Sequence, residues 1–101
     1  MKRYSIRLTD EAELDLASIY SFVRKTSASS TVARDYVARI KTFVSRFETY
    51  PERGSIRDHV RPGLRIVGFE RRVSVAFMVE PTEVVILRIL FAGQRFESDE
   101  S

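Results

Sequence analysis

The side chains of this sequence best suited to chemistry are arginines. Lysine and arginine together number 17 against 14 aspartates and glutamates, and only Lys2, Lys25 and Lys41 are lysines. A guanidinium is planar and carries paired N–H donors, so it binds a carboxylate or a phosphate through two parallel hydrogen bonds. The position of each arginine decides whether it is merely a solvated surface residue. The candidates in the C-terminal half are Arg65, Arg72, Arg88 and Arg95.

Metal and cofactor chemistry have few suitable residues. The sequence has no cysteine, which excludes a disulfide or a thiolate metal site, and His59 is its one histidine. His59 lies in the turn-rich segment 51–62, where Asp58 is the one visible orienting group, and a loop histidine is more often exposed than catalytic. We therefore expect no metal and no cofactor.

Length and composition predict one soluble domain. With 101 residues and 44% hydrophobic residues, the chain has one core, so residues 1–101 form a single domain. The N-terminal MKRYSIRLTDE lacks an apolar stretch of signal-peptide length, and no run approaches the roughly 20 residues that span a bilayer. We expect a cytoplasmic protein without a membrane partner.

Apolar periodicity predicts two amphipathic helices. Thr9 is placed as the N-cap of the first, and Ser29 or Ser30 as that of the second. Tyr50-Pro51 should end the second helix, because the residue before proline avoids helical dihedral angles. The short connection predicts an antiparallel pair. The helix stripes contain Ala12, Leu16, Ile19, Tyr20, Val23, Ala33, Tyr36, Val37, Ile40, Val44 and Phe47.

Alternating residues predict strands at 4–8, 63–69, 72–79 and 84–91, followed by a polar tail from about residue 96. The last three strands are joined by short connections and should be antiparallel neighbours. The fold class is therefore α+β with the order β-α-α-β-β-β. We expect an antiparallel-dominated, four-stranded sheet with the antiparallel helical hairpin packed on one face.

The turn between the last two strands decides the position of Arg88. A two-residue turn at Pro81-Thr82 would place Arg88 beside Val75 in the core, and burying an unpaired charge costs several kcal/mol. A three-residue turn that also includes Glu80 would place it beside Ser74 and Arg72. We predict the three-residue turn.

In this register the sheet face away from the helices is apolar with a basic border. Monomeric proteins rarely expose such a patch, so we expect it to bind a polypeptide, best an acidic segment that becomes ordered on docking. Alternatively, the C-terminal tail or the 51–62 loop folds over it. The predicted contact residues are Arg72, Ala76, Met78, Val84, Ile86, Arg88 and Leu90.

Several segments resemble the ParE branch of the RelE/ParE toxin superfamily. They are YSIRLTDEAELDLASIYSFV, ARDYVARIKTFVSRFETYPERG, PGLR and VVILRIL, and the resemblance extends from about Tyr4 to Arg95. It implies the β-α-α-β-β-β fold and the toxin of a bacterial type II toxin–antitoxin pair. It also implies a hetero-oligomer with a cognate antitoxin, expected to be a ribbon-helix-helix protein with a flexible acidic C-terminal segment, which would bind the apolar face described above.

The superfamily includes two activities: ParE-like toxins poison DNA gyrase and block replication, whereas RelE-like toxins cleave mRNA on the ribosome. Cleavage needs a proton carrier beside cations that hold the phosphate. Here Phe91 stands where relatives often have histidine, and Phe96 has no proton to donate. The weak candidates for a ribonuclease are His59, Arg65, Arg72 and Arg88.

We therefore expect inhibition of gyrase by binding rather than catalysis. The alternatives are a ribosome-dependent endonuclease of RelE type and a degenerate toxin that retains only antitoxin binding. The predicted target-binding residues are Arg65, Arg72, Arg88, Phe91, Arg95 and Phe96.

Overall fold

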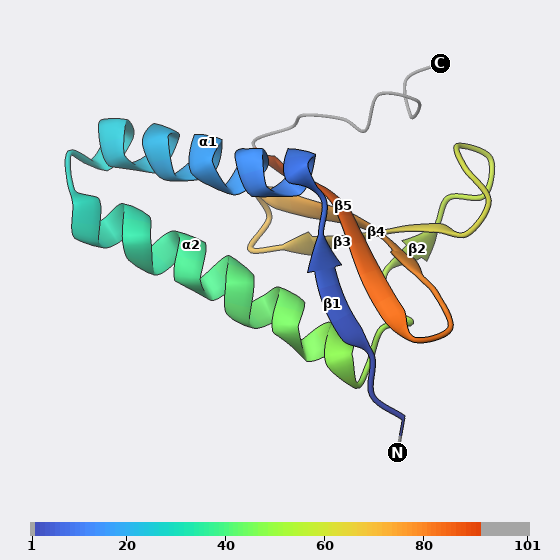
Figure 1. Ribbon diagram of the computed structural model, residues 1–101. Helices are drawn as coiled ribbons and strands as arrows, with labels where there is room; N and C mark the ends of the chain where they lie inside the picture. Colours follow the sequence, from blue (N-terminus) through green and yellow to red (C-terminus); the bar gives the residue numbers. More distant parts are fainter. Residues whose placement is uncertain (1, 92–101) are drawn as a thin grey trace.

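The computed structural model describes residues 2–91, which form a helical hairpin on one side of a sheet (Figure 1). The elements are β1 (Ser5–Leu8), α1 (Asp10–Ser27), α2 (Ser30–Ser45), the 3-10 turn η1 (Arg46–Glu48), β2 (Ser55–Ile56), β3 (Leu64–Phe69), β4 (Val73–Val79) and β5 (Glu83–Phe91). The strand order is β1-β5-β4-β3-β2, with β1 parallel to β5 and all other pairs antiparallel. The predicted α+β class is confirmed.

The sheet has five strands where four were predicted. Within the predicted loop 51–62, Ser55 and Ile56 pair with Ile66 and Arg65 and form β2 at one edge. Gly54 allows this approach: its φ is 76°, and a Cβ there would collide with the carbonyl of Ile66. A strand of two residues has no alternation that can be read in a sequence.

Both helices begin at predicted caps. The Thr9 hydroxyl accepts a hydrogen bond from the N–H of Ala12 at 3.1 Å, and the Ser29 hydroxyl accepts one from Val32 at 3.2 Å. The second helix ends earlier than predicted, at Ser45, and η1 continues the chain. Within residues 2–91, neither helix is long and apolar enough to cross a membrane.

The core lies between the helical hairpin and the sheet. The predicted stripe residues Leu16, Ile19, Ile40 and Phe47 are buried there. The sheet contributes Val73, Val75, Phe77, Val84, Ile86 and Ile89.

The turn between β4 and β5 differs from the prediction. Val79 pairs with Val84, and the N–H of Glu80 donates to the carbonyl of Glu83 at 2.8 Å. The turn therefore has the two residues Pro81 and Thr82 at its centre, and the predicted three-residue turn is wrong.

A β-bulge at Leu87 prevents this shorter turn from burying Arg88. Phe77 pairs with Ile86, but its neighbour Ala76 pairs with Arg88, so Leu87 is an additional residue in β5. The bulge reverses the alternation of faces along the strand. Ile89 thereby enters the core, while Arg88 lies opposite Ala76 rather than beside Ser74 and Arg72.

The predicted partner-binding patch is corrected accordingly. Val84 and Ile86, assigned to the outer face, are fully buried against the helices because they precede the bulge. Ala76 and Leu90 are also buried, at 0% and 3% exposure. Of the seven predicted contact residues, the structure leaves at least partly exposed only Arg72, Met78 and Arg88.

Candidate functional site

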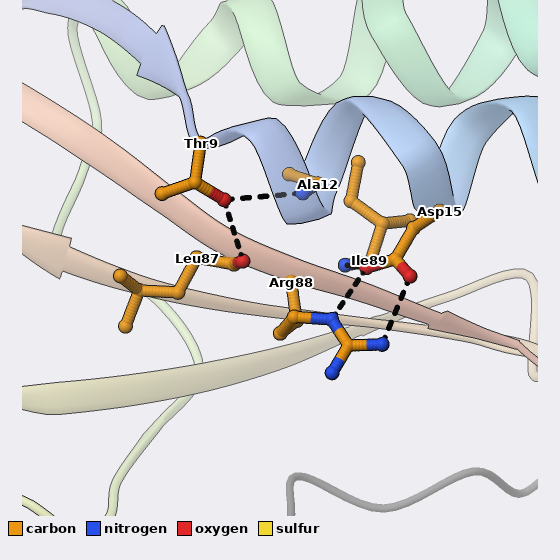
Figure 2. A network of polar contacts seen from close by, with 6 residues as sticks. All are labelled: Thr9, Ala12, Asp15, Leu87, Arg88 and Ile89. Atoms are coloured by element: carbon orange, nitrogen blue, oxygen red, sulfur yellow. Dashed lines mark hydrogen bonds and ion pairs between the residues drawn. The ribbon is translucent and has the colours of Figure 1, made fainter.

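Arg88 is joined to helix α1 by a two-pronged ion pair with Asp15 (Figure 2). Its Nε donates to Oδ2 of Asp15 at 2.8 Å, and its Nη2 donates to Oδ1 at 2.9 Å. The side chain of Asp15 is 12% exposed and that of Arg88 is 31% exposed. Charge-assisted bonds in this partly buried setting hold the guanidinium in one orientation.

The same carboxylate also completes the hydrogen bonding of β5. Strand β1 pairs with β5 only as far as Ile86, so no strand of the described residues 2–91 lies beside the rest of β5 on that side. Oδ2 of Asp15 accepts the backbone N–H of Ile89 at 2.8 Å. Asp15 therefore satisfies a strand amide and an arginine together, which fixes α1 against the sheet.

Thr9 also connects α1 to β5, at the start of the helix. Its N–H donates to the carbonyl of Ile86 at 3.0 Å, and its hydroxyl donates to the carbonyl of the bulged Leu87 at 2.8 Å. The hydroxyl oxygen also caps α1 through Ala12, as drawn in Figure 2. Thr9 and Asp15 thus hold the bulge that turns Arg88 away from the core.

Arg72 and Phe91 are brought together at the end of the sheet. The Cζ of Arg72 lies 5.8 Å from the centre of the Phe91 ring, within cation–π range. Phe91 also makes edge-to-face contacts with Phe22 at 5.3 Å and Tyr36 at 6.0 Å. Burial raises the pKa of Tyr36, whose buried hydroxyl has no hydrogen-bond partner among residues 2–91.

The other predicted residues do not converge on Arg88. Arg65 pairs with Phe77 and so shares the helix-facing side of the sheet, whereas Arg88 pairs with Ala76 and belongs to the opposite side. His59 lies in the exposed loop between β2 and β3, and Asp58 accepts the N–H of Gly63 at 2.9 Å. The cluster of Arg65, Arg72 and Arg88 that the alternative ribonuclease activity would need is therefore not assembled within residues 2–91.

Two predicted target-binding residues, Arg95 and Phe96, lie outside the described residues. Across the described part of the chain, no group of three or more histidine, cysteine, aspartate or glutamate side chains is placed to hold a metal ion.

Asp15 is the functional candidate that sequence reasoning missed. It begins the segment DLASIY, and Phe22 follows seven residues later on the same flank of α1. Asp15 contacts Arg88 and Phe22 contacts Phe91, so this flank follows β5. The i, i+7 spacing was available in the sequence, but an acidic helix residue is ordinarily solvated and nothing local identified its partner.

Comparison with known proteins identifies the family. The sequence matches the family described as the ParE toxin of the type II toxin–antitoxin system, parDE, over residues 6–96. The chain belongs to the ParE toxin family. The matched residues include both Asp15 and Arg88.

A solved structure agrees with this assignment to the ParE family. A chain from the chromosomal ParDE TA system of P. aeruginosa is 28% identical to this one, with a TM-score of 0.76. The alignment covers 89% of this chain and 97% of the other. No curated protein sequence matches significantly. The predicted resemblance to ParE and the RelE/ParE type of fold are confirmed, apart from the additional strand β2.

Proposed function

We propose that this ParE-family chain is the toxin of a type II toxin–antitoxin pair and that it inhibits DNA gyrase by binding it. The observation that carries the proposal is the fixing of Arg88 by Asp15 at 2.8 and 2.9 Å. A cation held in one orientation is suited to recognition, because little side-chain entropy remains to be lost on binding.

The arrangement of the other cations favours binding over RNA cleavage. A ribonuclease needs several cations around one phosphate and a proton carrier within hydrogen-bond reach. Arg65 and Arg88 belong to opposite sides of the sheet. We therefore keep Arg72, Arg88 and Phe91 as proposed target contacts, and rank ribosome-dependent cleavage second.

The proposed regulator is a cognate antitoxin. The likeness to a chain of a ParDE system supports an antitoxin partner for this one. We propose a ribbon-helix-helix protein with an acidic C-terminal segment, which forms a hetero-oligomer with the toxin in the cytoplasm. The net charge of +3 at pH 7 is compatible with an acidic partner.

Induced expression in a bacterial host tests this proposal. We expect growth to stop with DNA replication failing before protein synthesis, and co-expression of the product of the neighbouring open reading frame to restore growth. An immediate stop of translation with mRNA cut on ribosomes would replace gyrase with the ribosome. Normal growth would indicate a degenerate toxin that retains only antitoxin binding.

A further inference from the structure

A cavity separates helix α2 from the turn between β3 and β4, away from the Asp15–Arg88 pair. Its volume is about 280 Å³. One wall is a flank of α2 and the other is the end of β3. The lining residues used below are Arg39, Phe43, Arg46, Phe69 and Glu70.

The cavity already holds a carboxylate from the protein itself. Nε of Arg39 donates to Oε2 of Glu70 at 2.9 Å, and Nη2 donates to Oε1 at 3.0 Å. Both side chains are substantially exposed, at 51% and 39%. An ion pair this exposed contributes little to stability, so a competing carboxylate can exchange with Glu70.

Glu70 lies in the hairpin turn between β3 and β4. The turn places Glu70 at a φ of 49° and Arg71 at 65°, in the left-handed region. Positive φ at two successive central residues is typical of tight hairpin turns, so the turn itself sets this backbone conformation. Exchange of the Glu70 carboxylate on Arg39 therefore requires no change of the backbone.

Arg46 is a second cation beside the cavity. Among residues 2–91, the structure contains no hydrogen bond or ion pair to the side chain of Arg46. Arg39 lies on α2 and Arg46 is the residue that caps its C-terminal end, seven residues later, which places both on the same flank, about 10 Å apart along the helix axis.

The floor of the cavity is aromatic but offers few open ring faces. Phe43 lies 4.7 Å from Phe69 and 5.4 Å from Phe47, measured between ring centres. Arg53 lies over Phe43 at 5.5 Å. Single-stranded nucleic acid needs free faces on which bases stack, whereas an aliphatic side chain needs only apolar contact. This floor therefore favours a peptide.

We propose that this cavity binds an acidic peptide segment of a partner protein, one of whose carboxylates displaces Glu70 from Arg39 while another engages Arg46. Apolar side chains between the carboxylates contact Phe43 and Phe69. The identity of the partner as the antitoxin rests on the proposed function, but the cavity and its chemistry do not.

Binding of a short fluorescent peptide of alternating glutamate and leucine to the full chain tests this at low salt, where charge interactions are least screened. We expect it to bind at least about tenfold more tightly than the same peptide with glutamine for glutamate. Arg46→Ala should weaken binding about tenfold, and Glu70→Gln should tighten it several-fold by freeing Arg39.

Glu83→Gln is the matched control. Glu83 makes an equally two-pronged, exposed pair with Arg7, far from the cavity on β1 and β5. Glu83→Gln removes the same negative charge as Glu70→Gln. If only the gain in net positive charge mattered, both variants would therefore bind the peptide equally more tightly. Thermal unfolding of each variant confirms that it is folded.

Three results would overturn the proposal. The first is that Glu70→Gln and Glu83→Gln increase the affinity for the peptide equally, and the second is that not even Glu70→Gln binds the peptide. The third is that oligothymidylate displaces the peptide at equal concentration. The last would indicate a nucleic-acid site. The assay contains neither gyrase nor antitoxin, so its failure leaves the proposed toxin function intact, and failure of the growth test leaves the cavity intact.

Discussion

Asp15 and Arg88 are 73 residues apart in the sequence, yet two hydrogen bonds of 2.8 and 2.9 Å join their side chains. They belong to DLASIY and ILRIL, two of the segments on which the resemblance to ParE toxins rests. The contact joins these two segments in the folded chain. An aspartate on α1 closes the edge of β5 and at the same time orients the arginine that the bulge turns out of the core.

Replacement of Asp15 should reveal its two roles separately. Asp15→Asn keeps an oxygen for the N–H of Ile89 but loses the charge, and we expect a loss of about 2 kcal/mol in the free energy of unfolding. Asp15→Ala also removes the acceptor and should cost about 1 kcal/mol more. Denaturant unfolding measures both. A control is Glu83→Gln, whose exposed pair should matter less; equal effects would contradict the assigned role of Asp15.

Thr9 should be sensitive to loss of its hydroxyl. Thr9→Val removes both the cap of α1 and the donor to the carbonyl of Leu87, for a combined loss of about 2 kcal/mol. Thr9→Ser retains the hydroxyl and should remain within about 0.5 kcal/mol of the wild type. The same unfolding experiment measures both variants. A Thr9→Val protein as stable as Thr9→Ser would show that the hydroxyl has no structural role.

Deletion of Leu87 should leave the faces of β5 unchanged. Leu87 is the additional residue of the bulge, so without it Ile86 still pairs with Phe77 and Arg88 still pairs with Ala76. The deletion removes the carbonyl that accepts the Thr9 hydroxyl, and we expect a loss of about 1 kcal/mol in the free energy of unfolding. Circular dichroism on heating measures the result. A deletion variant that does not fold, while Leu87→Ala does, would contradict the register.

The Arg7–Glu83 pair should make a pH-dependent contribution to stability. The hydrogen bond and the charge of Arg7 lower the pKa of Glu83 below its ordinary value of 4.5. Because the folded-state pKa is depressed, the stabilisation is complete above pH 4.5 and is lost as the pH falls through the lowered pKa. Unfolding of the wild type and Glu83→Gln should thus differ at neutral pH and agree in strong acid. A difference that grows in acid would have the wrong sign.

The sequence predicts the helices of this protein well because their signals are local. Thr9 and Ser29 are caps that can be recognised from their neighbours, and the apolar stripes repeat over several turns. The bulge at Leu87 has no such local signal. It depends on which side chains of β5 face the core, and that is decided only when the strand pairs with β4 and packs against the helices. Asp15 was missed for the same reason.

The central claim is that the chain inhibits gyrase by binding through its fixed arginine, and a supercoiling assay with purified gyrase tests it most directly. The wild-type protein should block supercoiling. Arg88→Ala should inhibit gyrase at least about tenfold more weakly, and truncation before Arg95 should also weaken inhibition. Glu83→Gln should inhibit as strongly as the wild type. If folded wild-type protein leaves supercoiling unchanged and cuts mRNA on translating ribosomes instead, the account is contradicted.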